Sequence, residues 1–308
     1  MNTIVPILSI CIPTYNRKQY LKKGITSIVD QFVNYIWLTR NVEVIILDDK
    51  STDGTEQMVQ NYLKTYSNIS YIRNQKNLGS FKSVMKVATY ARGQYIWFFT
   101  DDDLQKPKAL ETVLNVLKKQ KPDLVMANLD MCTLDAEALV DPNLLRVSKD
   151  QYFPSKKELF TFLESKFFLP IDWFLTSYSN MIIKKIIFDE NNEKINSLYN
   201  KKHNMFPHTA LIYYTPQDYS VYVIAKPIAL YRTGNLSFGP KNKIDFLKFW
   251  YPVLKSHYAV ICQANRQYIS NKFRFLMMLK ILVRDIRIVF LKIFNYDISV
   301  VLMKLFYR

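Results

Sequence analysis

Three consecutive carboxylates, Asp101, Asp102 and Asp103, directly follow the uncharged aromatic run from Tyr95 to Phe99. Such a run predicts a strand buried on both faces, as in the interior of a parallel sheet. The acids then lie at the carboxyl end of the strand, where open α/β sheets bind their ligands. Adjacent carboxylates raise each other's pKa by repulsion, and a cation among them relieves that cost. Because oxygen ligands suit Mg²⁺ or Mn²⁺, the triplet predicts a metal–diphosphate site.

An acidic triplet can also be a solvated turn, with Asp103 near the start of the helix that follows Pro107, where the helix dipole favours it. Polar residues at the other predicted strand ends favour the ligand site. They are Thr14 to Arg17, Asp48 with Asp49, and Arg73 to Gly79. Four polar loops at one edge of a sheet describe a nucleotide pocket better than one loop does.

These loops depend on strands and helices in strict alternation over the first 128 residues. We expect strands at Ile7–Ile12, Val42–Leu47, Ile69–Ile72, Tyr95–Phe99 and Asp123–Asn128, and helices at about Tyr20–Gln31, Thr55–Tyr66, Phe81–Ala91 and Pro107–Gln120. Alternation predicts an α/β fold with a largely parallel sheet, right-handed crossovers and helices on both faces.

The later part of the chain is less regular. The run from Trp173 to Ile183 is typical of a strand or a cleft floor, and we expect a helix over Asn204–Tyr214 that begins at Pro207. Two short strands, Tyr219–Ile224 and Pro227–Tyr231, should return to the sheet. From Met131 to Phe168 the periodicity is too weak to assign elements.

Glycine use argues against two common nucleotide-binding motifs. The chain has six glycines, at positions 24, 54, 79, 93, 234 and 239, and contains neither GxGxxG nor GxxxxGK[ST]. A pocket without a glycine cradle must neutralise a diphosphate by other means, and a metal on the Asp cluster would do so.

Composition indicates a packed protein rather than a linker-rich one. The 308 residues are 49% hydrophobic and include only 12 Pro. Three widely spaced cysteines, Cys11, Cys132 and Cys262, form no metal-spaced pair and favour a reducing cytoplasm. The opening MNTIVPILSI lacks a basic region, so we expect no signal peptide, and without a run of about 18 uncharged apolar residues we expect no membrane-spanning helix.

The net charge of +16 is concentrated at the C-terminal end. Residues 241–308 hold thirteen Lys and Arg against three Asp, so ten of the sixteen net charges lie there. On a helical wheel, residues 273–294 separate a basic half from a wide uncharged apolar half. That pattern fits a helix in a membrane interface and equally a helix packed on its own domain.

Five segments in order resemble the bacterial family 2 glycosyltransferases of the GT-A fold, which invert the anomeric carbon and use nucleotide-activated sugars. They are SICIPTYNR at 9–17, VIILDDKSTDGT at 44–55, RNQKNLGSFKS at 73–83, GQYIWFFTDDDLQKP at 93–107 and YRTGNLSF at 231–238. The general resemblance is to transferases that build O-antigen or capsule, and more loosely to the abequosyltransferase branch.

The resemblance implies a GT-A domain over 1–240, with a donor-binding half at 1–130 and an acceptor half at 131–240, followed by a basic amphipathic helical extension at 241–308. It implies a nucleoside diphosphate sugar as donor, with a UDP-sugar expected first, and Mn²⁺ or Mg²⁺ as cofactor. The acceptor would be a saccharide or a polyprenyl-diphosphate-linked saccharide. We expect a cytoplasmic protein, and peripheral contact with the inner face of the membrane through 273–294 stays open.

The resemblance also implies roles for individual residues. The donor-binding residues would be Pro13, Thr14, Tyr15, Arg17, Asp48, Asn77, Gly79, Lys82, Asp101 and Arg232, and the metal ligands Asp102 and Asp103. In many family members the first acid of the DXD motif stands where this chain has Thr100, so which two of the three Asp bind metal stays open. Asp48 would accept a hydrogen bond from a pyrimidine, or else cap its own turn. Arg232 would bind phosphate bidentately, or else be a surface residue.

The general base is the point at which this chain departs from the family pattern. Many members place an acid at the start of the helix beyond the cleft floor, where this chain has Phe206-Pro207-His208-Thr209. His208 is our first candidate because a histidine pKa near ~6.5 leaves it mostly neutral. A structural hydrogen bond is the alternative, and Asp172 is the second candidate, with Asp189 and Asp218 behind it.

Two other classes of protein remain open. A nucleic-acid-binding protein would use the basic tail and the 21 tyrosines, although acidic strand ends would repel a phosphate backbone. A catalytically inactive GT-A domain would bind nucleotide without transferring sugar.

Overall fold

The computed structural model describes residues 5–165, 177–199, 207–213, 215, 217–232, 270–272, 275 and 279. Its strands are β1 (Leu8–Thr14), β2 (Val42–Asp48), β3 (Ile69–Arg73), β4 (Tyr95–Phe98), β5 (Leu104–Gln105), β6 (Leu124–Cys132), β7 (Leu139–Asp141), β8 (Gln151–Phe153), β9 (Met181–Lys184) and β10 (Val221–Arg232). Its helices are α1 (Lys18–Asn34), α2 (Leu38–Asn41), α3 (Thr55–Leu63), α4 (Ser80–Thr89), α5 (Ala109–Gln120), α6 (Lys156–Ser165), α8 (Lys185–Tyr199) and α9 (Pro207–Tyr213).

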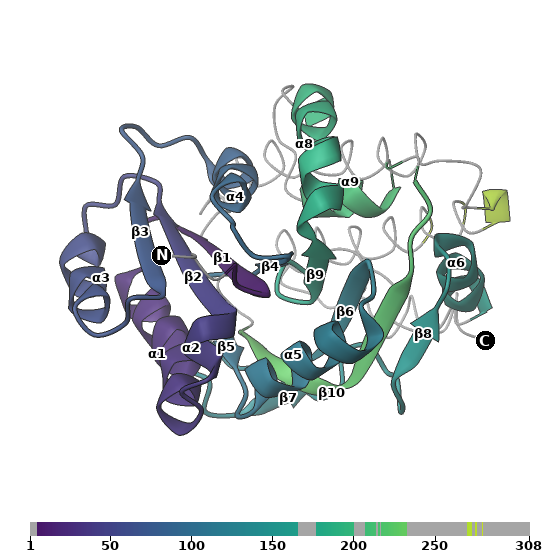
Figure 1. The fold of residues 1–308 in the computed structure, drawn as a ribbon, viewed down its shortest axis with the longest axis horizontal. Helices are drawn as coiled ribbons and strands as arrows, with labels where there is room; N and C mark the ends of the chain where they lie inside the picture. The colour runs from purple at the N-terminus through teal and green to yellow at the C-terminus, as the bar shows by residue number, and fades with distance from the viewer. Residues whose placement is uncertain are drawn as a thin grey trace, which may run out of the picture.

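One sheet runs through the molecule in the order β3-β2-β1-β4-β9-β6-β10-β5, with β7 paired to β6 and β8 to β10 (Figure 1). β3, β2, β1 and β4 are parallel neighbours, and β10 is parallel to β6. β9 is antiparallel to both β4 and β6, so those two strands share one direction. The six strands β3, β2, β1, β4, β6 and β10 therefore point the same way, and their carboxyl ends meet at one edge.

The two faces of the sheet bury separate apolar layers because side chains alternate along each strand. On β1, Leu8, Ile10 and Ile12 pack with residues of α1, α2, α3 and α5, whereas Cys11 packs with residues of α4, α6, α8 and α9. Figure 1 shows α4, α8 and α9 on one side of the strands and α1, α2 and α5 on the other. The α/β architecture with helices on both faces is confirmed.

Close packing at the start of β4 requires a glycine. A Cβ atom on Gly93 would lie 2.7 Å from Ser9 Oγ and 2.8 Å from Ser9 N. The Gly93 N–H instead donates to Ser9 Oγ at 2.8 Å, and that hydroxyl donates to Glu43 at 2.6 Å. This contact joins the loop before β4 to β1 and β2, and it sets the position of the strand that carries the acidic triplet.

The predicted elements are present, with several corrections. Pro13 does not end the first strand, which continues to Thr14, and the helix expected from Pro107 begins at Ala109 because Lys108 is left-handed with φ 65°. The two late strands are one strand, β10, whose register with β6 shifts between Ile224 and Ala229. That irregular stretch includes Pro227, which has no N–H for the ladder.

The region from 131 to 168 also contains elements that the sequence did not reveal. β7, β8 and α6 lie there, and β9 occupies the end of the run predicted as a strand or cleft floor. The division at residues 130 and 240 and the extension over 241–308 stay predictions, because most of 233–308 lies outside the described residues. No helix in the described ranges is long and apolar enough to cross a bilayer.

Candidate functional site

The polar loops predicted at the strand ends lie together at the carboxyl edge of the sheet. In the parallel register Thr14 is opposite Asp48, and Asp48 is opposite Arg73. Beyond the strands, the Asp49 N–H donates to the carbonyl of Thr14 at 2.8 Å, and the Asn74 N–H donates to the carbonyl of Asp48 at 2.8 Å. The pairing of β1, β2 and β3 thus continues into the loops and holds them side by side.

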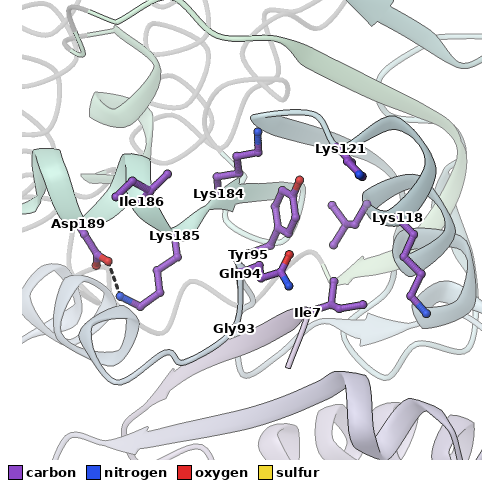
Figure 2. A pocket seen from close by; sticks show the side chains of 11 residues that line it. Ile7, Gly93, Gln94, Tyr95, Lys118, Lys121, Lys184, Lys185, Ile186 and Asp189 are labelled. Carbon is purple, nitrogen blue, oxygen red and sulfur yellow. Dashed lines mark hydrogen bonds and ion pairs between the residues drawn. The ribbon is translucent and has the colours of Figure 1, made fainter. Parts of the chain in front are cut away.

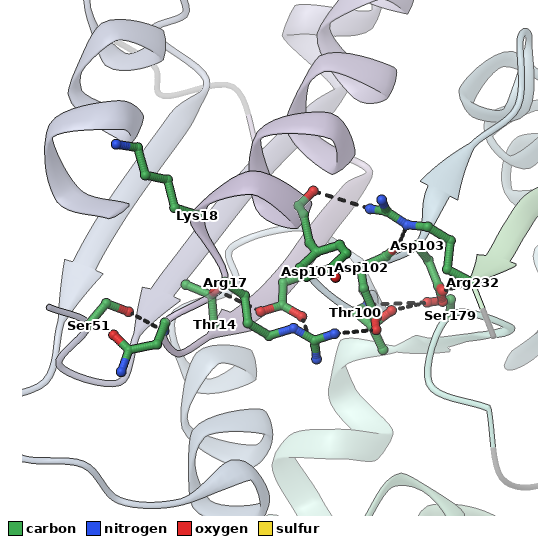
Figure 3. Close-up of polar contacts among 12 residues, drawn as sticks. Thr14, Arg17, Lys18, Ser51, Thr100, Asp101, Asp102, Asp103, Ser179 and Arg232 are labelled. Carbon is green, nitrogen blue, oxygen red and sulfur yellow. Dashed lines mark hydrogen bonds and ion pairs between the residues drawn. The ribbon is translucent and has the colours of Figure 1, made fainter. Parts of the chain in front are cut away.

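The first two acids of the triplet contact residues at the end of β1 and the start of α1 (Figure 3). The Thr14 hydroxyl donates to Asp101 Oδ2 at 2.7 Å. Arg17 donates from Nη2 to Asp102 Oδ2 at 2.6 Å, and its Nη1 lies 3.4 Å from Asp101 Oδ1. One guanidinium therefore bridges two neighbouring carboxylates. Lys18, the next residue along, points away from the triplet.

Arg232, the last residue of β10, holds the other side of the triplet. Its backbone N–H donates to Asp103 Oδ1 at 3.2 Å and its Nε–H donates to the backbone carbonyl of Asp102. Its Nη2 lies 3.3 Å from the carbonyl oxygen of Tyr20, and its guanidinium lies 5.1 Å from the Tyr20 ring centre. The guanidinium of Arg17 lies 5.3 Å from the same ring centre. Tyr20 thus contacts both cations that flank the acids.

Burial makes the negative charges of the triplet costly. Asp101 is 6% exposed and Asp103 is 1% exposed. Burial, with repulsion from Asp102, raises the pKa of Asp103 to about 7. Burial also raises the pKa of Asp101 to about 7, although Arg17 opposes that rise. Burial alone would lower the pKa of Arg17, yet Asp101 and Asp102 raise it above its ordinary value.

Two guanidinium N–H groups at this site have no acceptor. Arg17 Nε and Arg232 Nη1 are buried and hydrogen-bond to nothing among the described residues. Buried donors of this kind are rare in folded proteins and call for an explanation. Both belong to cations beside the triplet, so an anionic ligand with several oxygen acceptors, such as a diphosphate, would supply what they lack.

The triplet suits a divalent cation that is completed by a ligand's oxygens. The described residues contain no group of three or more His, Cys, Asp or Glu side chains placed to hold a metal. A pair of carboxylates with phosphate oxygens is the usual arrangement for Mg²⁺. The buried, mutually repelling acids provide such a pair, so the donor set fits Mn²⁺ or Mg²⁺.

Asp48 and Asp49 shape the neighbouring loops. Asp48 is fully buried and accepts hydrogen bonds from the Ser51 N–H at 2.7 Å and from the Tyr71 hydroxyl. The turn-capping alternative is therefore realised, and a pyrimidine contact by Asp48 stays a prediction. Asp49 accepts from the backbone N–H groups of Leu78 at 2.8 Å and Gly79 at 2.9 Å, and so fixes the loop that leads into α4.

The other predicted donor residues lie along the same edge with fewer contacts. Gly79 has φ +84°, a conformation that glycine adopts without strain, and its N–H also lies 2.9 Å from Asn77 Oδ1. Tyr15 is 45% exposed, Lys82 is exposed and Pro13 is half-buried in β1. Exposed side chains at this edge are free to contact a ligand, but none of these three adds to the polar network around the triplet.

Three of the four base candidates lie within the described residues. His208, in α9, is 1% exposed, and its ring centre lies 4.0 Å from that of Tyr178 and 6.5 Å from that of Phe98. Asp172 lies outside the described residues. Asp189 pairs with Lys185, and Asp218 accepts the backbone N–H of Lys156 at the start of α6.

The sequence analysis did not predict the contacts that Ser179 and Tyr20 make at the site. The Ser179 hydroxyl accepts the Thr100 N–H at 3.1 Å, and the Ser179 carbonyl accepts the indole N–H of Trp97 at 2.8 Å, so Ser179, two residues before β9, holds the end of β4. No local pattern marks Ser179. Tyr20 follows Arg17 by three residues, a spacing that brings side chains together on a helix, and this signal was available.

A groove of about 600 Å³ lies at the opposite edge of the sheet, near the starts of β1 and β4 (Figure 2). Four lysines line it, and three of them already have partners. Lys184 lies 2.6 Å from Asp123, Lys185 pairs with Asp189, and Lys118 lies 4.9 Å from the ring centre of Trp37. The side chains of Lys118 and Lys185 point away from each other in Figure 2, so the groove offers no focused anion site.

The fold and the acidic edge can be set beside proteins of known sequence and structure. Residues 9–190 match the description "Glycosyl transferase family 2". Abequosyltransferase RfbV of Salmonella typhimurium is 29% identical over 79% of this chain and 73% of its own length. GalNAc(5)-diNAcBac-PP-undecaprenol beta-1,3-glucosyltransferase of Campylobacter jejuni is 34% identical over 36% of this chain and 34% of its own length.

Solved structures share the same fold. TarS 1-349 of S. aureus in complex with UDP-GlcNAc superposes with a TM-score of 0.62 and 17% identity, over 90% of this chain and 72% of that one. The mannosyltransferase PcManGT of Pyrobaculum calidifontis in complex with GDP-Man and Mn²⁺ gives a TM-score of 0.54 and 15% identity, over 90% and 69%.

A mostly parallel sheet with an acidic triplet at its carboxyl edge defines a GT-A-type glycosyltransferase fold. With more than half of its residues matched, the chain belongs to glycosyl transferase family 2 and is a glycosyltransferase. Another relative, TuaG of Bacillus subtilis, is named as a putative teichuronic acid biosynthesis glycosyltransferase.

Proposed function

We propose that this glycosyltransferase moves a sugar, with inversion, from a nucleoside diphosphate donor to a saccharide or polyprenyl-diphosphate-linked saccharide in bacterial surface polysaccharide synthesis. The donor we propose first is a UDP-sugar. The observation that carries the proposal is the acidic triplet at the carboxyl edge, flanked by two guanidinium groups that each have an unsatisfied buried N–H.

The chemistry of this edge matches a diphosphate and its cation. Asp102 and Asp103 would hold Mn²⁺ or Mg²⁺, which would neutralise charge on the departing diphosphate when bound. Arg17 and Arg232 would donate to the phosphate oxygens, since guanidinium groups bind phosphate bidentately. Support for a metal comes from the Mn²⁺ complex of PcManGT, and support for a uridine nucleotide comes from TarS, which binds UDP-GlcNAc.

The nucleoside would lie along the loops that follow β1, β2 and β3. Thr14 and Tyr15 would border the base and ribose, with Pro13 beneath them, and Asp48 would face the pyrimidine. Asn77, Gly79 and Lys82 would border the same pocket from the loop before α4. Because Asp48 already holds the Ser51 turn and the Tyr71 hydroxyl, we expect it to act chiefly by fixing the shape of the pocket.

Inversion requires an acceptor hydroxyl that attacks the anomeric carbon from the face opposite the diphosphate as the bond to the diphosphate breaks. A base takes the proton of that hydroxyl. We keep His208 as the first candidate and Asp172 as the second. His208 contacts Tyr178 and Phe98 in the core, so as a base it would need a rearrangement that exposes its ring to the acceptor.

The acceptor and the location are proposed from the relatives. The C. jejuni relative is named for a PP-undecaprenol-linked saccharide, and an acceptor of this chemistry would bring the enzyme to the inner face of the membrane. Residues 273–294, which would provide a peripheral contact, lie largely outside the described residues.

Calorimetric titration with UDP, GDP, CDP and dTDP, each with and without Mn²⁺, tests the donor site directly. We expect tight binding of one nucleotide that weakens sharply without metal. Asp102→Ala should abolish metal-dependent binding and sugar transfer with the fold intact. Asp141→Ala serves as the matched control, because Asp141 forms an exposed ion pair with Arg146 outside the acidic triplet. Full transfer by Asp102→Ala would refute the metal assignment. Nucleotide binding by a protein that transfers no sugar would instead identify an inactive GT-A domain.

A further inference from the structure

Arg17 occupies a position that a cation among the three carboxylates would be expected to fill. Its Nη2 lies 2.6 Å from Asp102 Oδ2 and its Nη1 lies 3.4 Å from Asp101 Oδ1. Arg232 contributes to the triplet mainly through hydrogen bonds to a backbone carbonyl and from its own backbone N–H, and makes no ion pair with the three acids within the described ranges. Among the residues that the structure describes, Arg17 is therefore the cation that forms ion pairs with the acids.

The contacts of Arg17 leave part of its guanidinium group without an acceptor, which favours the exchange of one partner for another. Each of the two carboxylates receives one contact from Arg17, the longer of them at 3.4 Å, and the Arg17 Nε–H has no acceptor among the described residues. Arg17 is the residue immediately before α1, and its carbonyl accepts the Leu21 N–H at 3.0 Å. Its backbone is thus anchored, and its side chain, 15% exposed, lies over the Tyr20 ring.

We propose that Arg17 is a built-in counter-cation that holds Asp101 and Asp102 while the donor site is empty, and that it exchanges Asp102 for the donor's diphosphate when a divalent cation binds. This inference rests on the proposed function. It assigns Arg17 two successive partners and makes it a positioning residue that couples metal binding to donor binding.

Charge balance gives the exchange its direction. When all three carboxylates are ionised, they exceed the guanidinium groups of Arg17 and Arg232 by one negative charge. A divalent cation reverses that excess to positive, and an Arg17 side chain beside the cation is then repelled from the acids and attracted to phosphate. Metal and nucleotide should therefore each strengthen the binding of the other, as linkage requires.

The test uses Arg17→Gln and Arg17→Lys, with Arg146→Gln as the control, since Arg146 forms an exposed ion pair with Asp141. Binding of Mn²⁺ alone is followed by electron paramagnetic resonance of free Mn²⁺, and binding of UDP at saturating Mn²⁺ is followed by calorimetry. Thermal unfolding verifies that each variant is folded. Arg17→Lys keeps the charge but cannot bridge two carboxylates as a planar guanidinium does.

For Arg17→Gln we expect Mn²⁺ alone to bind about tenfold more tightly, and UDP at saturating Mn²⁺ to bind about tenfold more weakly, each factor corresponding to roughly 1.4 kcal/mol. For Arg17→Lys we expect Mn²⁺ alone to bind about threefold more tightly, about half of a tenfold step in free energy, with UDP binding nearly retained. Arg146→Gln should leave both affinities unchanged.

Three results would overturn the proposal. Unchanged or weaker Mn²⁺ binding in both Arg17 variants would show that the guanidinium does not compete with metal. If Arg17→Gln binds Mn²⁺ more tightly while Arg17→Lys binds it as the wild type does, the loss of one positive charge alone would explain the effect. Failure of the folded wild-type protein to bind UDP with Mn²⁺ would defeat the proposed function as well, whereas normal wild-type binding with no effect at Arg17 defeats this inference alone.

Discussion

Replacing Asp103 by Asn should make the metal-free protein more stable at neutral and alkaline pH. Asp103 is 1% exposed and is repelled by Asp102, and no ion pair within the described residues compensates it, although hydrogen bonds from Ser179, Thr100 and the Arg232 backbone oppose the rise of its pKa. The amide of Asn is nearly the same size, carries no charge and can still accept the Arg232 N–H at Oδ1. The substitution therefore removes the buried charge and keeps the hydrogen bond.

The pKa of Asp103 gives both the size and the sign of this effect. Burial raises it to about 7 in the folded protein, against ~3.9 in an unfolded chain. The folded state therefore retains a proton that the unfolded state loses, so the free energy of unfolding falls as pH rises from about 4 to about 7. A shift of roughly three pKa units corresponds to a ceiling of about 4 kcal/mol above pH 7. We expect Asp103→Asn to recover about 2 to 4 kcal/mol at pH 8 and little at pH 4.

Urea unfolding at pH 4 and pH 8, with EDTA present, measures this difference. Asp123→Asn is the matched control, because hydrogen bonds from Lys184 and Ser220 lower the pKa of Asp123 despite its partial burial. That control should lose stability at pH 8, the opposite sign. A loss of stability in Asp103→Asn at pH 8 would refute the argument that the buried charges of the triplet lower the free energy of unfolding and that a bound cation relieves this.

Three further outcomes are expected. Tyr20→Leu removes the ring that contacts both guanidinium groups. At about 0.5 to 1 kcal/mol for each of the two contacts, it should weaken UDP binding roughly five- to thirtyfold without unfolding the protein; unchanged calorimetric titrations would contradict this. Gly93→Ala places a Cβ 2.7 Å from Ser9 Oγ and should lower stability by about 2 kcal/mol in thermal unfolding, and a variant as stable as the wild type would show that this contact is loose. His208→Ala should reduce turnover more than donor affinity, and unchanged turnover would move the base elsewhere.

Local sequence determined the donor-side half of the fold and the composition of its acidic edge. An uncharged run such as Tyr95 to Phe99 is too apolar to lie anywhere but inside a sheet, and its carboxyl end had to carry the triplet. Alternation of strands and helices then required parallel pairing, so the loops after β1, β2 and β3 had to meet. These inferences rest on short-range periodicity, which one sequence contains.

Long-range pairing decided what the sequence could not. β9 inserts antiparallel between β4 and β6, and nothing in Met181–Lys184 distinguishes an inserted strand from an edge strand. The same insertion brings Ser179 to the end of β4, and the return of β10 brings Arg232 to Asp102 and Asp103, 129 to 130 residues earlier in the chain. Contacts of that separation leave no periodic trace in the sequence.

The sequence by itself identified which chemical groups this protein brings to its carboxyl edge: three acids, two arginines and the polar ends of four strands. Only the tertiary structure decided how they are paired. Arg17 bridges Asp101 and Asp102 while Asp103 stays buried beside Arg232, because packing fixes where each backbone lies and charge then selects the nearest partner.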